Sequence, residues 1–493
     1  MTFYFYDLET SGINPRAQRI MQFAGQRTDM DLNPIGEPQN WLVKITEEIL
    51  PDPEAVLITG ITPQKSIDEG YSEAEFLKLF CDEVLQPDTV ICGFNTIRFD
   101  DEFMRATLWR NFYDPYEWQW QDGRSRWDLL DVVRMVRALR PEGVEWPFED
   151  RIENTEYHGA QDVLGKKVVK VPSNRLELIT KANGLDHDNA HDALNDVNAT
   201  ISVAKMLKSK QPQMFEYLFK MRDKKRVKEL VNLDEKKPFV YTSGRYESGY
   251  NKTTVAFPIT SGKNGNVIAY DLRYDPTPFL NLNEEELSKN IFASWDDRKK
   301  DGFVKLPIKE LQYNKCPAVA PLGVLTQNNG WEHISLDEST VDRHMKILLS
   351  NPAFAEKLRS ALEQRPDYQS EFDPDFRLYD GFVADKDKTK MRAVRVAEES
   401  RLVDMNLDFS DSRLTGLLPR YKARNFPKSL TKDELDEWNE YKGNRIKNGI
   451  NGQLPVNEYV SKLGLLATTN SDEKSQFLIQ ELQLYAESIL DYE

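Results

Sequence analysis

The first residues of the chain form a short aromatic run, 2–6, followed at once by the acidic residues Asp7 and Glu9. Such a run is typical of a buried strand, and side-chain alternation along a strand puts Asp7 and Glu9 on the same side. Two neighbouring carboxylates there repel each other, and a hard cation such as Mg²⁺ or Mn²⁺ between them removes that cost. The same spacing also occurs where a strand frays into solvent, so the pair alone leaves both interpretations open.

Strand-like and helix-like segments alternate over the first 200 residues. The expected strands span 2–6, 20–28, 41–45 and 90–93. The expected helices span 101–111, 127–139, 176–182 and 189–207, and a capping box at 72–75 begins another one. This alternation predicts an α/β layer fold.

The pattern changes after about residue 205. Residues 205–237 carry 11 basic and 5 acidic side chains, a local charge of +6. Strand-like runs follow at 253–259, 267–272 and 303–309, and helical segments at 344–349, 354–363 and 475–490. We therefore expect three domains: an α/β domain at 1–205, a β-rich domain at 206–350 and a helical domain at 351–493.

The overall charge constrains the class of partner. The chain has 81 acidic and 65 basic side chains, a formal charge of −16, which disfavours non-specific binding to nucleic acid or to anionic membranes. Its three cysteines, Cys81, Cys92 and Cys316, lie far apart, which predicts a reducing compartment rather than a disulfide framework. With neither a signal-peptide pattern nor an apolar run of about 20 residues, the chain is expected to be cytoplasmic, with no membrane partner.

Two further segments carry candidate chemical groups. Asp100 follows a strand and opens a helix, where the helix dipole favours acids in any case, so Asp101 and Glu102 are interpreted as cap or surface residues. His191 and Asp196 lie at the start of the last helix of the α/β region and could converge on one substrate. His187 and His191 could also be a zinc pair, but no third histidine or cysteine ligand lies near them.

In combination, the three segments are specific. An Asp-x-Glu on the first strand, an Asn-x₃-Phe-Asp and a His-x₄-Asp, in that order, resemble the DEDDh family of 3′→5′ exonucleases, whose core has the ribonuclease H-like fold. The resemblance implies that Asp7, Glu9, Asp100 and Asp196 are the metal-binding acids and that His191 is the general base.

The resemblance extends beyond these motifs. The runs LITGITPQ at 57–64, RNFYDPY at 110–116, RWDLLD at 126–131 and YKARNFP at 421–427 look like bacterial exodeoxyribonuclease I, so the similarity covers most of the chain. It implies an SH3-like middle domain and a helical C-terminal domain that enclose the substrate. Residues 151–173 look like an insertion relative to the family pattern.

The implied activity is two-metal hydrolysis of single-stranded DNA from the 3′ end to nucleoside 5′-monophosphates, in DNA repair and recombination. The implied cofactor is Mg²⁺, two ions per site, which Mn²⁺ can replace. The implied partner is single-stranded DNA-binding protein, whose acidic C-terminal tail would dock on a basic surface that the sequence does not locate. We expect the chain to act as a monomer and to digest processively.

Two sequence features favour a single-stranded substrate independently of the family. Arginines and aromatic residues interleave over 105–134, and the run 222–226 is strongly basic; stacking faces beside guanidiniums are typical of grips on unpaired bases. Such residues can equally be core or solvated surface. By resemblance, the substrate-binding residues are Glu9, Arg105, Tyr116, Trp120, Arg134 and Arg175 near the active site, and Tyr217, Lys224 and Lys309 beyond it.

Two alternatives remain open at this point. A DEDDh RNA-trimming enzyme or a polymerase proofreading subunit would leave about 290 residues without a role. A DNA-binding scaffold that has lost catalysis is disfavoured by the complete set of Asp7, Glu9, Asp100, His191 and Asp196.

Overall fold

The computed structural model describes residues 1–152, 168–185, 192–365, 372–405, 407–450 and 452–490. These residues form two compact units, neither of which is one continuous stretch of chain. The first unit combines described residues from 1–126 and 192–201 with the C-terminal part from 372 onward. The second unit combines 127–185 with 202–365, within the same described ranges.

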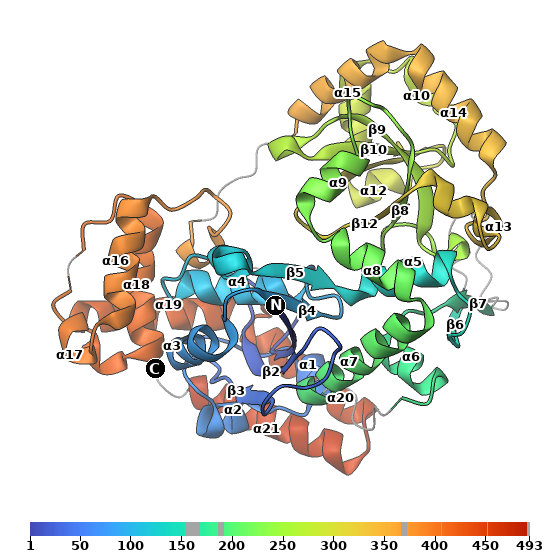
Figure 1. The fold of residues 1–493 in the computed structure, drawn as a ribbon. Helices are drawn as coiled ribbons and strands as arrows, with labels where there is room; N and C mark the ends of the chain where they lie inside the picture. Colours follow the sequence, from blue (N-terminus) through green and yellow to red (C-terminus); the bar gives the residue numbers. More distant parts are fainter. Residues whose placement is uncertain (153–167, 186–191, 366–371, 406, 451, 491–493) are drawn as a thin grey trace. The chain divides into compact units, whose positions relative to one another are not determined.

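A five-stranded sheet begins the fold, with strand order β3-β2-β1-β4-β5 (Figure 1). Its strands are β1 (Thr2–Thr10), β2 (Ile20–Thr28), β3 (Gln39–Leu42), β4 (Thr89–Gly93) and β5 (Ser125–Asp128). β1 is antiparallel to β2 and parallel to β4. β1 is longer than predicted because it stays paired with β2 until a register shift at Glu9 and Thr10.

The third predicted strand, 41–45, lies two to three residues too far along the chain. β3 pairs with β2 from Gln39 to Leu42, and Val43 then makes only an isolated bridge to Tyr71. The helix expected from residue 127 begins at Leu129, since 127 and 128 complete β5. Asp128 then caps this helix by accepting a hydrogen bond from the backbone N–H of Leu130.

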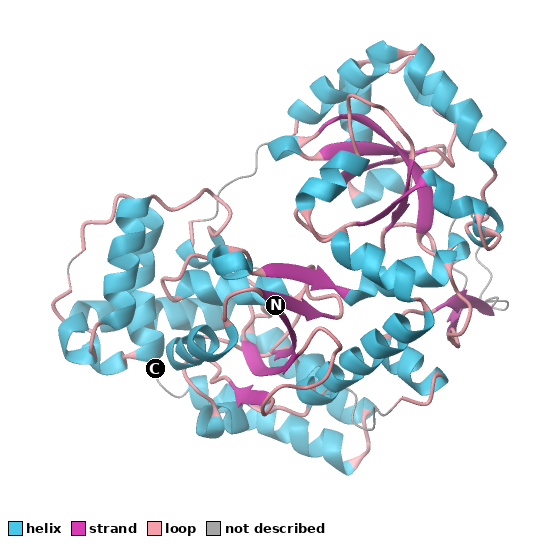
Figure 2. Ribbon diagram, in the orientation of Figure 1, coloured by secondary structure: helices cyan, strands magenta, loops and turns pink. Residues whose placement is uncertain are grey.

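Helices accompany this sheet (Figure 2). In chain order they are α1 (Pro53–Thr59), α2 (Pro63–Glu69), α3 (Glu73–Leu79), α4 (Asp100–Arg110) and α7 (Ala193–Lys210). The predicted capping box is confirmed at α3, where the Ser72 hydroxyl and the Glu75 carboxylate satisfy each other's backbone N–H groups.

The C-terminal part of the first unit is helical, as predicted. Its main helices are α16 (Asp385–Val396), α17 (Glu399–Leu402), α18 (Ser412–Asn425), α19 (Lys432–Asn448), α20 (Val456–Thr469) and α21 (Glu473–Leu490). One apolar cluster joins α18 to the end of α4, with Trp109 and Phe112 packed among Leu414, Leu417 and Tyr421. These helices therefore share a core with the sheet domain.

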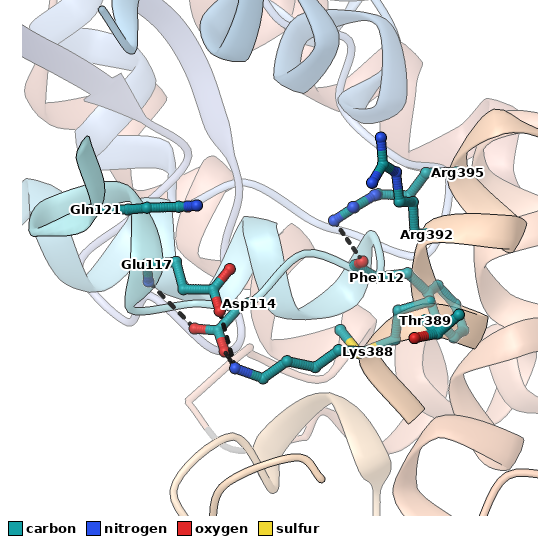
Figure 3. A pocket seen from close by; sticks show the side chains of 9 residues that line it. Phe112, Asp114, Glu117, Gln121, Lys388, Thr389, Arg392 and Arg395 are labelled. Carbon is teal, nitrogen blue, oxygen red and sulfur yellow. Dashed lines mark hydrogen bonds and ion pairs between the residues drawn. The ribbon is translucent and has the colours of Figure 1, made fainter. Parts of the chain in front are cut away.

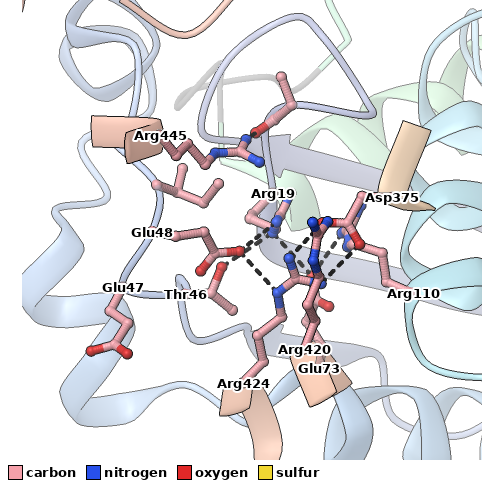
Figure 4. A network of polar contacts seen from close by, with 12 residues as sticks. Arg19, Thr46, Glu47, Glu48, Glu73, Arg110, Asp375, Arg420, Arg424 and Arg445 are labelled. Atoms are coloured by element: carbon pink, nitrogen blue, oxygen red, sulfur yellow. Dashed lines mark hydrogen bonds and ion pairs between the residues drawn. The ribbon is translucent and has the colours of Figure 1, made fainter. Parts of the chain in front are cut away.

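Buried ion pairs reinforce that junction (Figure 4). Arg424 of α18 donates to Glu48 at 2.9 Å and to Asp375 at 2.5 Å. Glu48 also accepts from Arg19 at 2.7 Å, and every one of these four side chains is at most 1% exposed. A charge taken out of water this completely is stable only when its partners stay in place. Buried ion pairs thus attach the C-terminal helices to the sheet domain within the first unit.

The second unit is built on a five-stranded antiparallel sheet of order β11-β10-β9-β8-β12. Its strands are β8 (Phe239–Thr242), β9 (Thr253–Ser261), β10 (Val267–Asp271), β11 (Ile308–Leu311) and β12 (Ala318–Pro321). The strand predicted at 303–309 is wrong in its bounds. Pairing begins only after Pro307, a residue with no backbone N–H to donate.

Helices and a β-ribbon complete the second unit. The helices are α5 (Leu129–Leu139), α6 (Leu176–Ala182), α8 (Pro212–Lys220), α9 (Lys224–Leu230), α10 (Thr277–Leu280), α11 (Glu284–Ile291), α12 (Trp295–Arg298), α13 (Gly330–His333), α14 (Glu338–Ser350) and α15 (Pro352–Glu363). The suspected insertion contributes β7 (Val168–Pro172), antiparallel to β6 (Phe148–Ile152), and its residues 153–167 lie outside the described ranges. Within the part of the chain that the structure describes, every helix falls short of the length and apolarity that a bilayer span requires.

Candidate active site

Three of the predicted acids converge at the end of β1. One carboxylate oxygen each from Asp7, Glu9 and Asp196 lies within 4.8 Å of the other two. Asp7 and Glu9 share one side of the strand, and Asp196 comes from the first turn of α7. Oxygen ligands gathered in this way suit a hard divalent cation.

Asp100, the fourth predicted acid, is the first residue of α4 and is only 3% exposed. Its Oδ1 accepts a hydrogen bond from the backbone N–H of Leu8 at 3.1 Å, which places it beside the strand that carries Asp7. The approach is close because β4 ends at Gly93, where a Cβ would lie 2.6 Å from the carbonyl oxygen of Tyr6.

The electrostatics of this acid cluster favour a cation. Burial, and then the charges of Asp100, Asp196 and Asp192, raise the pKa of Asp7 well above its usual value. Burial and the neighbouring Asp7 raise the pKa of Glu9 to about 9. These shifts report carboxylates that cannot all ionise together, and a divalent cation among them reverses the effect. The donor set therefore fits the divalent metal that the sequence predicts.

The predicted general base, His191, lies outside the described residues, as does His187 of the alternative zinc pair. Asp192, directly after His191, is absent from the sequence-based candidates. Its Oδ1 accepts from the backbone N–H of Asn195 at 3.2 Å, and its charge contributes to the raised pKa of both Asp7 and Glu9. The one feature of the sequence that could have indicated Asp192 is its position, directly before the helix that carries Asp196.

The interpretation of Asp101 as a cap or surface residue is wrong. Asp101 is 2% exposed and accepts hydrogen bonds from Tyr6, Gln119 and Arg126. The residue at the cap position of α4 is Phe99, which makes no side-chain capping bond. Glu102 is not a simple surface residue either, because it accepts from Arg105 at 2.6 Å and from the Tyr379 hydroxyl.

Four of the predicted substrate-binding residues belong to the first unit: Glu9 of the acid cluster, Arg105, Tyr116 and Trp120. The Arg105 guanidinium lies 5.7 Å from the centre of the Tyr116 ring and is held by Glu102 and by Gln119. Trp120 is 62% exposed, as a side chain that stacks on an unpaired base must be.

Most of the other residues in the interleaved stretch have structural roles. Arg110 pairs with Glu73 at 2.7 Å, and Arg124 donates to the carbonyl oxygen of Trp118 at 2.9 Å. Trp127 is buried and packs edge-on against Phe215, with ring centres 5.1 Å apart. The sequence pattern of arginines and aromatic residues therefore suggests more substrate-contacting residues than the structure allows, because many of these side chains are buried.

The remaining predicted substrate-binding residues belong to the second unit. Arg134 pairs with Asp131 at 2.7 Å, and its guanidinium lies so close to Gly244 that a Cβ there would be 2.9 Å away. Arg175 is exposed. The Tyr217 hydroxyl donates to a backbone oxygen in β12, Lys224 is exposed at the start of α9, and Lys309 Nζ lies 4.1 Å from the centre of the Tyr241 ring.

A cavity of about 390 Å³ in the first unit lies between α16 and the segment 112–121 (Figure 3). Its lining includes none of the four acids. Lys388 of α16 donates to Asp114 and to Glu117, at 2.8 Å each, so its charge is matched within the cavity. Asp114 also accepts from the backbone N–H of Tyr116 at 2.9 Å. The cavity wall therefore fixes the segment that carries Tyr116.

Three family models match successive parts of the chain. The Exonuclease family model matches residues 4–204, the Exonuclease I SH3-like domain matches 222–364, and the Exonuclease I C-terminal domain matches 372–489. The α/β sheet with its acid cluster is thus the ribonuclease H-like core of an exonuclease, followed by an SH3-like and a helical domain. The predicted fold class is confirmed.

Individual relatives match over nearly the whole chain. Exodeoxyribonuclease I of Escherichia coli is 37% identical over 99% of this chain and 98% of that protein. A moderately thermophilic exonuclease I from Methylocaldum szegediense superposes with a TM-score of 0.90 at 38% identity, covering 99% of both chains. The zinc-bound E. coli exonuclease I–single-stranded DNA complex gives 0.90 at 36% identity, also over 99% of both. The chain belongs to the exodeoxyribonuclease I family, as the sequence motifs predict.

Proposed function

We propose that this protein hydrolyses single-stranded DNA from the 3′ end to nucleoside 5′-monophosphates, by a mechanism that uses two divalent cations. The observation that carries the proposal is the convergence of Asp7, Glu9 and Asp196 beside the buried Asp100. The choice of substrate is supported by the E. coli relative whose structure is a complex with single-stranded DNA.

The acids would share the metal-binding roles. Asp7, Glu9 and Asp196 would hold one ion, and Asp7 with Asp100 the other, with Mg²⁺ as the expected ion and Mn²⁺ able to replace it. Bound there, the cations supply a water of lowered pKa and neutralise charge on the leaving oxygen. Because a histidine titrates near neutral pH, His191 would take the proton of the attacking water.

The proposed substrate grip would combine exposed and partly exposed cationic and aromatic groups with the buried Arg105. In the first unit, Arg105, Tyr116 and Trp120 would contact phosphates and bases, and Glu9 would also contact the substrate. In the second unit, the corresponding residues would be Arg134, Arg175, Tyr217, Lys224 and Lys309.

The remaining parts of the proposal concern the cellular setting. The domain boundaries 1–205, 206–350 and 351–493 stay a prediction, and enclosure of the strand by these domains would make digestion processive. We propose that the protein acts as a cytoplasmic monomer in DNA repair and recombination, with the acidic tail of single-stranded DNA-binding protein as its partner.

One assay tests the activity. End-labelled single-stranded DNA, duplex DNA and RNA are incubated with and without Mg²⁺, with Asp7→Ala as the matched inactive variant. Mononucleotide release from the 3′ end of single-stranded DNA alone, abolished by EDTA, is expected. Preference for RNA would instead indicate a trimming enzyme, and tight DNA binding without cleavage would indicate a scaffold.

A further inference from the structure

A buried carboxylate outside the acid cluster, Asp101, comes directly after Asp100 in α4. The Asp101 Oδ1 accepts from the Tyr6 hydroxyl at 2.6 Å, and its Oδ2 accepts from Gln119 Nε2 at 3.2 Å and from an Arg126 guanidinium nitrogen. Its backbone N–H donates to the Thr96 carbonyl oxygen at 2.9 Å. Asp101 is therefore fixed at both its main chain and its side chain.

The partners of Asp101 show what it holds in place. Tyr6 and Leu8 flank Asp7 on β1, and both are attached to the first turn of α4. The Leu8 N–H donates to Asp100 and the Tyr6 hydroxyl donates to Asp101. Asp7 thus lies between two anchored neighbours, one on each side along the strand, and the two anchoring acids are consecutive in the helix.

The same carboxylate reaches the proposed substrate grip. Gln119 donates to Asp101 through Nε2 and accepts from Arg105 Nη2 through Oε1 at 2.8 Å. Arg105 is 5% exposed and lies over Tyr116. A chain of hydrogen bonds therefore runs from Asp101 through Gln119 to the guanidinium that would meet the phosphate.

We propose that Asp101 is a positioning residue of the active site, which sets the place of Asp7 on β1 through Tyr6 and the orientation of Arg105 through Gln119. This inference rests on the proposed function. The Asp101 carboxyl group offers two acceptor oxygens to these three donors, whereas an amide has one acceptor oxygen and would turn its NH₂ group toward one of them. Groups behind metal ligands act by holding the ligands in their productive geometry.

The first test is Asp101→Asn in the full chain. We expect kcat on single-stranded DNA to fall, and the Kd for Mn²⁺ measured by calorimetry without substrate to rise, each by about 10- to 100-fold. The matched control is Asp387→Asn, another buried aspartate, which accepts from the Ser410 hydroxyl and from the backbone N–H groups of Ser410 and Asp411. The control should lower Tm and leave kcat and the Mn²⁺ affinity unchanged.

The second test is Tyr6→Phe, which removes one hydroxyl and keeps the ring, so it remains informative if Asp101→Asn does not fold. Its loss of kcat and of Mn²⁺ affinity should be smaller. In the Asp101→Asn background it should add nothing, because the hydroxyl acts through Asp101. Unchanged kcat and Mn²⁺ affinity in both variants, or a lowered Tm alone as in the control, would overturn the proposal. A wild-type protein without metal-dependent nuclease activity would instead overturn the proposed function.

Discussion

Two groups of buried acids in the first unit have opposite electrostatic surroundings. In the acid cluster of Asp7, Glu9, Asp100 and Asp196, burial and mutual repulsion raise the pKa of Asp7 and of Glu9. In the ion-pair network around Arg424, burial also acts to raise the pKa of Asp375, but Arg424 and Arg420 hold it well below its usual value. Glu48 is held low in the same way by Arg424 and Arg19.

The difference separates a structural use of buried charge from a functional one. The ion-pair network carries its own counter-ions and is complete within the protein. In the acid cluster the carboxylates repel one another, which costs folding free energy. A bound cation would remove this repulsion, and the free energy so gained would contribute to metal affinity. Acids alone therefore do not identify a metal site; what distinguishes the ion-pair network is that Glu48 and Asp375 are paired with arginines.

The largest expected effect comes from breaking the ion-pair network. Arg424→Met leaves Glu48 and Asp375 buried without their shared partner, and should lower the free energy of unfolding by about 3–5 kcal/mol. Urea unfolding followed by circular dichroism measures it. A loss under about 1 kcal/mol would show that water reaches these carboxylates.

The next effect comes from the acid cluster itself. Asp196→Asn removes one ligand of the proposed metal site, and should lower turnover of single-stranded DNA by at least about 100-fold, the upper end of what residues behind the ligands cost. The variant should fold normally, because it relieves repulsion. Turnover near that of the wild type would remove Asp196 from the site.

The raised pKa of Glu9 predicts how metal-free stability depends on pH. A group whose pKa rises from its usual 4.5 to about 9 on folding stabilises the native state fully below pH 4.5, and this contribution is lost as the pH rises toward 9. In EDTA, Glu9→Gln should therefore unfold at a higher Tm than the wild type at pH 8, by a few degrees for about 1 kcal/mol or more. The difference should shrink toward pH 5. Calorimetric scans of both proteins at both pH values measure the difference in Tm. If Glu9→Gln and the wild type had the same Tm at pH 8 as well as at pH 5, the raised pKa of Glu9 would be contradicted.

The smallest effect is expected where the same chemistry is exposed. Lys78 and Asp82 form an ion pair at 2.6 Å on the surface of the first unit, with 75% and 59% of the side chains exposed. Lys78→Ala should leave the free energy of unfolding unchanged within the error of the measurement. Comparing Lys78→Ala with Arg424→Met shows whether burial of the ion pair causes the larger loss of unfolding free energy.

The sequence leads to the acid cluster through the resemblance, because Asp7 and Glu9 alone leave two interpretations open. Asp7 and Glu9 are two residues apart on one strand, and the bounds expected for β2 and α6 agree with the structure. Asp101 could not be assigned in this way. An acid in the first turn of a helix is expected on general grounds, and the tyrosine that reveals its role is 95 residues away.

The ion-pair network shows the same limit more strongly. Arg424 and Glu48 are 376 residues apart, and neither lies in a pattern that distinguishes it from a surface charge. Their burial follows from the packing of α18 on the sheet domain, through side chains such as Trp109 and Tyr421. Only the tertiary structure brings such partners together.

The late position of Arg424 has a consequence for how the protein is made. While the chain is being synthesised, Glu48 emerges from the ribosome 376 residues before the Arg424 guanidinium that completes the network, and Arg19 emerges earlier still. Until then Glu48 has Arg19 as a partner but not Arg424, so we expect this part of the sheet domain to be less well protected. Nascent chains that stop before α18 should accordingly be more sensitive to protease around Glu48 than the finished chain. The ion-pair network can therefore form only after the residues of α18 have been synthesised.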